Sequence, residues 1–423
     1  MKRLSDFRYR DFYIAGVIFI IFGFSIDSFN NIVNGMINII KSPSVLVSDY
    51  IEIGGMGASF INAGLMLLLS SFIAEINKTR ITGGLVSALF TVVGFSFFGK
   101  NLINSIPLMI GVYLYCKYKK VDVSNYMHIM FFVTGISPIV SLFYFGLNFS
   151  LWIGLILGTL IGILIGFIII PIASSMISFH DGYSLYNVGF SIGIIGLVFA
   201  GVLRMFDREI PEISIIYTGS DLYPTIFFST LSIVFIIYGL VRNKGLKDYK
   251  DLMSKSGRLV TDFTVSYNKY LVILNVGILG LISILYVKIC GGIINGPIIS
   301  GMMTVMGFGV FGKHPKNVIP VILGVFIASK LNKYEPSSTS SILIALFSTT
   351  IAPIAGEYGI LAGIFAGFIH KAVATNVGFI HGGINLYNNG LAGGLVAGIL
   401  VPIFRNLKER IKRWIKKEKK LVR

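Results

Sequence analysis

The chain has 423 residues, of which 54% are hydrophobic and 13% charged, and its formal net charge is +17. A mean hydropathy of +0.81 excludes a soluble globular domain, and runs of about 20 apolar residues match the thickness of a bilayer. We therefore expect an all-α polytopic membrane protein.

Fourteen apolar runs follow one another in two sets of seven. The first set lies near residues 12–30, 50–75, 81–99, 103–117, 128–146, 150–178 and 184–204, and the second near 223–241, 269–288, 296–312, 317–331, 339–357, 359–379 and 384–403. No small-residue cleavage site follows the first run, so we expect a retained span. If one hairpin in each set is re-entrant, each half still has an odd number of spans.

The run 150–178 is too long for one straight crossing, and Pro171 lies inside it. Proline removes a helix hydrogen bond and clashes with the preceding turn. We therefore expect a break near Pro171, with residues 172–182 irregular. Broken helices of this kind often mark transport sites.

Two sequence segments recur in the same order in each half. Residues 180–189 (HDGYSLYNVG) return as 381–390 (HGGINLYNNG), and residues 94–100 (GFSFFGK) return as 307–313 (GFGVFGK). This pattern predicts two internal repeats, residues 1–209 and 210–423. An odd number of spans per half inverts the second repeat relative to the first, with a pseudo-two-fold axis in the membrane plane.

Basic residues are concentrated in a linker, 242–268, and in a C-terminal tail, 404–423. With both termini in the cytoplasm of a bacterial plasma membrane, the inside loops carry the excess of Lys and Arg. We expect these segments to contact anionic lipid headgroups and not nucleic acid. Whether copies of the chain form a homo-oligomer is left open.

Small and polar residues within the runs have structural interpretations. Glycines spaced by four predict close helix packing, with a pore wall as the alternative: Gly154, Gly158, Gly162 and Gly166, matched by Gly359, Gly363 and Gly367. Asn62 and Asn275 are expected to cap helices or to join neighbouring helices. Lys100 and Lys313 are expected to snorkel to the interface.

The repeated polar residues are the candidate substrate-binding site: His180, Tyr186, Asn187, His381, Tyr387 and Asn388. Tyr and Asn offer neutral hydrogen-bonding groups, and a helix N-terminus adds unsatisfied N–H groups. A purely capping role for both Asn residues is equally compatible with the sequence. Asp181 and Glu357 are candidates for proton coupling.

The chain offers no cofactor motif. Its two cysteines, Cys116 and Cys290, have no CxxC spacing, and we expect neither a disulfide framework nor a metal site. There is no phosphate-binding loop and no His-Glu-x-x-His zinc motif. We therefore expect no cofactor and no enzymatic activity.

The paired His-x-Gly-x-x-Leu-Tyr-Asn-x-Gly strings, preceded by Phe-Gly-Lys…Ile-Pro strings, resemble an uncharacterised family of bacterial integral membrane proteins with two copies of a domain of unknown function. A looser similarity is to urea transporters, which also have inverted halves. The leading hypothesis is a transporter or channel for a small polar solute. The alternatives are an intramembrane enzyme acting on a lipid or prenyl-phosphate carrier, and a non-transporting scaffold.

Overall fold

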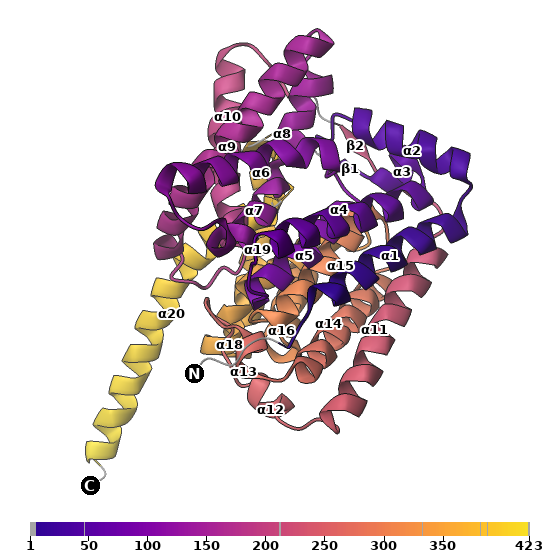
Figure 1. Cartoon of the computed structure of the whole chain (residues 1–423). Helices are drawn as coiled ribbons and strands as arrows, with labels where there is room; N and C mark the ends of the chain where they lie inside the picture. Colours follow the sequence, from indigo (N-terminus) through magenta and orange to yellow (C-terminus); the bar gives the residue numbers. More distant parts are fainter. Residues whose placement is uncertain are drawn as a thin grey trace.

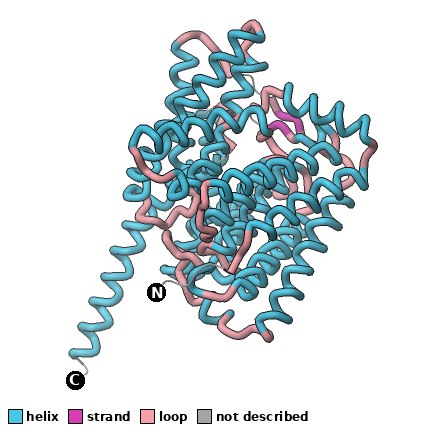
Figure 2. Tube along the Cα trace, viewed as in Figure 1, coloured by secondary structure: helices cyan, strands magenta, loops and turns pink. Residues whose placement is uncertain are grey.

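A computed structural model describes residues 6–45, 47–210, 213–331, 333–380, 382–386 and 388–421, and these are almost entirely helical (Figures 1 and 2). The strands in this part of the chain are β1 (Val47–Ser48) and β2 (Ser214–Ile215), which pair in parallel with Val47 opposite Ser214. The described residues contain nine helices long and apolar enough to cross a membrane, or ten if the bent pair Val123–Ile136 and Pro138–Gly146 is one span.

Within the described residues, the first repeat contains ten α-helices in chain order. They are α1 (Tyr9–Ile26), α2 (Phe29–Lys41), α3 (Tyr50–Gly54), α4 (Met56–Ile76), α5 (Gly83–Phe95), α6 (Leu102–Lys119), α7 (Met127–Phe132), α8 (Pro138–Ser141), α9 (Leu151–Phe179) and α10 (Asn187–Met205). Short 3-10 turns, Val123–Tyr126 and Val133–Ile136, flank α7, and a π-helical turn, Leu142–Gly146, follows α8.

The second repeat follows the same plan. Its helices are α11 (Leu222–Asn243), α12 (Tyr249–Leu252), α13 (Phe263–Ser266), α14 (Lys269–Ile289), α15 (Gly296–Gly307), α16 (Pro315–Leu331), α17 (Thr339–Ser348), α18 (Ala352–Tyr358), α19 (Ile360–Ile380) and α20 (Asn388–Leu421). The 3-10 turns Phe308–Val310 and Thr349–Ile351 follow α15 and α17. Helix α1 packs on α4 as α11 packs on α14, and α6 packs on α9 as α16 packs on α19.

The predicted runs correspond to helices, but not all of them are spans. Helices α5 and α15 have 13 and 12 residues. At 1.5 Å per residue each is about 20 Å long, which is shorter than the hydrocarbon core. Within the described residues, α5, α6, α15 and α16 are not among the helices that qualify as spans. Each repeat thus contains one helix too short to cross the membrane, followed by one that does not qualify as a span. If the bent pair counts as one span, five candidate spans remain in each half.

The expected break near Pro171 is wrong. Helix α9 continues from Leu151 through Pro171 to Phe179, and the irregular segment is 180–186. A proline removes a single hydrogen bond, whereas an interrupted helix would leave several backbone groups unsatisfied in lipid. Continuing the helix is therefore the less costly arrangement.

Helices α5 and α15 pack antiparallel at the centre of the molecule. A Cβ on Gly94 would lie 2.9 Å from the Met303 side chain, and a Cβ on Gly307 would lie 2.5 Å from that of Phe90. Gly94 corresponds to Gly307 in the repeat, and Phe90 to Met303, so the contacts are reciprocal. Reciprocity of this kind is the mark of a two-fold relation between two copies.

Helices α10 and α20 form a second reciprocal pair. A Cβ on Gly193 would approach the Leu391 side chain at 2.7 Å, and one on Gly394 would approach the Phe190 ring at 2.2 Å. The helices meet near their N-termini and diverge, α10 toward the top of the view and α20 toward the lower left (Figure 1). The two repeats therefore join along two pairs of corresponding helices.

The glycine stripes are packing surfaces, as predicted. A Cβ on Gly166 would lie 2.1 Å from the Leu108 carbonyl oxygen, and one on Gly367 would lie 2.1 Å from that of Val321. Helices α9 and α19 thus approach α6 and α16 with their backbones nearly in contact. Gly359 differs from the other stripe residues, because it lies at the junction of α18 and α19 with φ +95°.

Candidate functional site

Each Phe-Gly-Lys loop is held by one asparagine. Asn62 Nδ2 donates to the carbonyls of Ser96 (2.7 Å) and Lys100 (2.9 Å). Asn275 Nδ2 donates to those of Gly309 (2.7 Å) and Lys313 (2.8 Å). Each asparagine therefore joins its own helix, α4 or α14, to the loop that follows α5 or α15.

The two lysines at the ends of these loops point inward. Lys100 is 1% exposed and Lys313 is 0% exposed, so the snorkelling expected from the sequence is wrong. Gly99 and Gly312 precede them with φ +75° and +101°, a backbone conformation that favours glycine. These turns fold the chain back on itself, so the ammonium groups do not reach the interface.

Lys313 lies between hydroxyl groups and aromatic faces. Its Nζ donates to the Tyr186 hydroxyl and to Thr349 Oγ1 at 2.6 Å. The same atom lies 4.4 Å from the ring centroid of Tyr186 and 5.1 Å from that of Phe308. Tyr186 and Thr349 come from different repeats, so the Lys313 site lies between the two halves.

The two lysine loops lie at opposite ends of the α5–α15 pair. A Cβ on Gly83, at the start of α5, would lie 2.9 Å from the carbonyl oxygen of Val310 in the Lys313 loop. A Cβ on Gly296, at the start of α15, would lie 2.2 Å from that of Phe97 in the Lys100 loop. The length of the helices separates the loops by about 20 Å.

Buried aromatic rings connect the two ends. The Phe347 ring lies 5.7 Å from Phe95 and 6.1 Å from Tyr186, and the Phe308 ring lies 4.8 Å from Tyr186 and 5.7 Å from Phe132. These five rings come from both repeats. They form a continuous aromatic cluster along the interface that joins the halves.

His180 and Asn187 bond to one another beside this cluster. His180 Nε2 donates to Asn187 Oδ1 at 3.0 Å, and Asn187 Nδ2 donates to the Ala173 carbonyl at 2.8 Å. Both ends of the Asn187 amide are thus engaged, and this asparagine braces the junction between α9 and α10. No side-chain cap is present at the N-terminus of α10.

The second copy of the polar string is only partly described. His381 and Tyr387 lie outside the described residues. Asn388 Nδ2 donates to the Ala374 carbonyl at 3.4 Å, as Asn187 does to Ala173. Asn389 accepts from His370 Nε2 at 3.1 Å.

His370 and Lys371 are buried on α19, and the sequence analysis missed both. Lys371 Nζ donates to Ser341 Oγ at 2.9 Å. Their position could have been noticed in the sequence, because two ionisable residues inside the apolar run 359–379 are functional candidates by default. Ile169 and Ile170 occupy the corresponding positions on α9, so this feature belongs to one repeat only.

A cavity of about 190 Å³ lies against Tyr186 and Asn187. The first repeat contributes residues of α7, α9 and α10, and the second contributes Phe308, Phe311 and the linker residues Leu259 and Val260. Asn388 is not among the residues that line it. The wall is mostly apolar with a few polar groups, which is typical of small-molecule sites.

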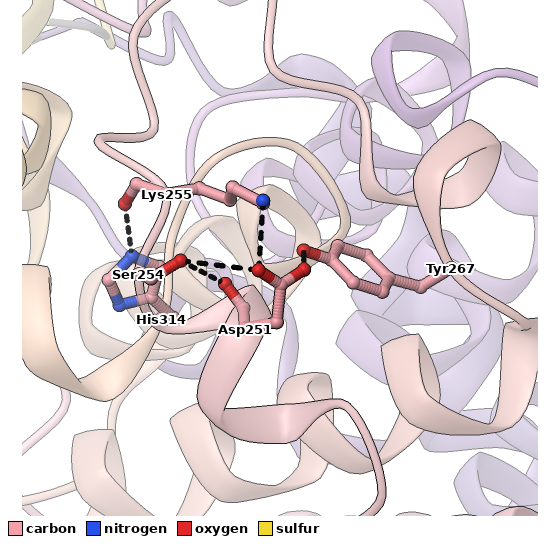
Figure 3. A network of polar contacts seen from close by, with 5 residues as sticks. All are labelled: Asp251, Ser254, Lys255, Tyr267 and His314. Atoms are coloured by element: carbon pink, nitrogen blue, oxygen red, sulfur yellow. Dashed lines mark hydrogen bonds and ion pairs between the residues drawn. The ribbon is translucent and has the colours of Figure 1, made fainter.

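The linker is fastened to the Lys313 loop. His314 Nε2 donates to the Lys255 carbonyl at 2.8 Å, and the Asp251 carboxylate accepts from Tyr267 (2.7 Å) and Lys255 (3.1 Å), as Figure 3 shows. The Tyr267 hydrogen bond, together with that from Lys255, lowers the pKa of Asp251. The network holds the segment leading to Leu259 and Val260 in place beside the cavity.

The two acids considered for proton coupling form ion pairs with the C-terminal helix. Asp181 pairs with Arg405 at 2.5 Å and Glu357 with Lys408 at 2.7 Å, with all four side chains exposed. Neither acid lines the cavity at Tyr186. They hold α20 against the loop 180–186 and the end of α18.

Two aspartates, one from each repeat, also join the halves, because each accepts hydrogen bonds from the opposite repeat. The Asp49 carboxylate accepts from Gly296 N at the start of α15 (3.2 Å). It also accepts from Ile51 N (2.9 Å) and Tyr217 N (3.0 Å). Asp262 accepts from Gly83 N at 2.9 Å at the start of α5. Each repeat thus caps the short helix of the other. The matching segments Val47-Ser48-Asp49-Tyr50 and Val260-Thr261-Asp262-Phe263 carried this signal.

The fold and the site define a polytopic helical membrane protein built from two repeats that share a buried, lysine-containing interface. The family model of DUF1576, described as a protein of unknown function, matches residues 28–205 and 241–406. The chain therefore belongs to this family, and the resemblance inferred from the repeated strings is confirmed. No curated protein and no solved structure matches the chain, so the similarity to urea transporters stays an expectation from the sequence.

Proposed function

We propose that the protein is a transporter or channel that moves a small polar solute across the bacterial plasma membrane, along the interface between its repeats. The observation that carries this proposal is the cavity of about 190 Å³ that both repeats line, next to Tyr186 and Asn187. A scaffold has no need of such a cavity at its symmetry interface. Ligand sites of transporters with internal repeats commonly lie where the halves meet.

The proposal includes an inverted arrangement of the repeats, with both termini in the cytoplasm. The antiparallel α5–α15 pair and the divergent α10–α20 pair support it, because corresponding helices of inverted repeats run in opposite directions. The count of candidate spans also supports it, since counting the bent pair as one span gives five, an odd number, in each repeat.

We propose transport in preference to chemistry on a lipid carrier. General acid–base catalysis needs titratable groups directed at one reacting centre. His128 and Tyr186 are the titratable side chains among the described residues that line this cavity. The Tyr186 hydroxyl accepts a hydrogen bond from Lys313 and serves the interface.

Flux measurements on proteoliposomes test the proposal. Purified protein should accelerate equilibration of at least one small solute in a panel of urea, glycerol, sodium formate and sodium nitrate. Asn187→Ala should lower that flux about tenfold or more, because it frees the junction of α9 and α10 that borders the cavity. The matched control is Asn376→Ala, since Asn376 is exposed and its amide donates to the Ala372 carbonyl of its own helix. Equal flux from both variants, or no flux of any solute, would contradict the proposal.

A further inference from the structure

We propose that the solute is a small anion, and that Lys313 and Lys100 are its two binding stations, one at each end of the repeat interface. This inference rests on the proposed transport function and names the charge of the solute.

Both lysines lack a carboxylate partner in the described part of the chain. The ion pairs found there are Asp251–Lys255, Asp221–Lys288, Asp181–Arg405, Glu357–Lys408 and Glu409–Arg413. None includes Lys100 or Lys313, although both side chains are buried. A buried charge without a counter-charge is strongly unfavourable. A bound anion is the partner that would offset this cost.

The groups around the Lys313 ammonium can accept its hydrogen bonds but carry no negative charge. Its hydrogen-bond partners, Tyr186 and Thr349, are neutral hydroxyls that accept from the ammonium. The ring faces of Tyr186 and Phe308 lie 4.4 and 5.1 Å from Nζ, and such faces attract a cation. None of these four contacts neutralises the charge. An anion bound here would supply the missing negative charge and stabilise the protonated lysine against the cost of its burial.

The repeat provides a second station at Lys100. Lys100 occupies the same place in its loop as Lys313. A glycine of positive φ, Gly99, precedes it, and Asn62 donates to its carbonyl. Among the described residues no hydrogen bond from the Lys100 ammonium is found. The loops lie at opposite ends of the α5–α15 pair, so an anion approaching from either face meets one lysine.

The aromatic cluster between the two lysine loops is compatible with an anion. The rings of Phe95, Phe347, Tyr186, Phe308 and Phe132 contact one another in that order. Aromatic edges carry partial positive charge, and pores selective for anions are lined by Lys or Arg where cation channels have Asp or Glu. Lys313 does not itself line the cavity of about 190 Å³ but contacts two residues that do, Tyr186 and Phe308. No acid is among the lining residues, and the volume suits an anion of a few heavy atoms.

Thermal stabilisation of the purified protein by anions tests the stations directly. Replacing sodium gluconate, a bulky anion, with sodium nitrate or sodium formate at constant ionic strength should raise the Tm of the wild-type protein by several degrees. The shift should disappear in Lys313→Met and shrink in Lys100→Met. It should persist in Lys316→Met, because Lys316 is exposed and lies three residues beyond Lys313. If Lys313→Met does not fold, Thr349→Val keeps the lysine and should weaken the shift.

Flux assays separate this inference from the proposed function. Nitrate or formate flux that falls in Lys313→Met and in Lys100→Met supports the anion stations and the transport function. Urea or glycerol flux without anion flux, or anion flux unchanged by both substitutions, overturns the anion stations and leaves transport standing. An anion-dependent Tm shift without flux of any solute keeps the stations and overturns transport. A Tm shift that is equal in the wild type and in Lys313→Met indicates an adventitious ion only and overturns the stations.

Discussion

At the scale of single residues, the interface depends on side chains exchanged between the repeats. Asp49 and Asp262 each cap the short helix of the opposite half, and the Lys313 ammonium is held by hydroxyls from both halves. Carboxylates at helix N-termini are favourable because they accept from free N–H groups and oppose the helix dipole. Small polar contacts thus fix the register in which two apolar repeats meet.

Replacing Asp49 with Ala should destabilise the protein more than replacing it with Asn. The alanine leaves the backbone N–H groups of Ile51, Tyr217 and Gly296 without their acceptor in a buried site, a loss of about 3 kcal/mol. The asparagine retains one acceptor oxygen. Midpoints from thermal unfolding in detergent measure the difference, and equal midpoints for the two variants would refute the capping role.

The stability should also depend on pH through Asp49. Burial raises the pKa of Asp49 to about 6, although hydrogen bonds from Tyr217, Ile51 and Gly296 oppose the shift. The folded protein then binds a proton that the unfolded chain, with a pKa near 4, has released. The contribution is complete below about pH 4 and is lost as the pH rises through about 6. The Tm of the wild type relative to Asp49→Asn should therefore be higher at pH 5 than at pH 8; a difference that is constant over this range contradicts the assignment.

At the scale of elements, the apolar runs predicted the long helices, and the glycines spaced by four predicted the packing faces of α9 and α19. The sequence did not predict α2 (Phe29–Lys41) as a separate helix, because α2 is amphipathic and begins within the first apolar run, 12–30. It placed the irregular segment too early, because one proline does not outweigh the unsatisfied backbone of a broken helix in lipid. It missed the inward course of Lys100 and Lys313, because snorkelling depends on where the loop points and a single sequence does not show this.

Glycine substitutions test the close approach of α9 to α6. Gly166→Val should destabilise the protein by about 3 kcal/mol or more, because its Cβ would lie 2.1 Å from the Leu108 carbonyl oxygen. Gly201→Ala on α10 is the control, since nothing lies within 4 Å of a Cβ there. The fraction of monodisperse protein after heating reports both effects. Comparable losses for the two variants would show that the glycine stripe does not hold these helices.

At the scale of the whole molecule, two repeats of one family domain meet around a lysine-containing interface. The repeated strings predicted this architecture, since the family model matches both halves. They did not reveal the exchanged aspartates or the aromatic cluster, whose members are distant in sequence and meet only after folding. His180, Tyr186 and Asn187 do lie together, but His180 and the Asn187 amide mainly bond to each other.

The central claim, that solute passes through the cavity between the repeats, is tested most directly by blocking that cavity with a covalent reagent. Ser174 lines it, and the neighbouring Ser175 on α9 does not. Each is changed to Cys in a Cys116→Ser, Cys290→Ser background, and flux of formate, nitrate and urea is measured before and after complete reaction with a bulky methanethiosulfonate. We predict that modification at position 174 abolishes solute flux and that modification at position 175 leaves it unchanged. Full modification at position 174 with undiminished flux would contradict the account.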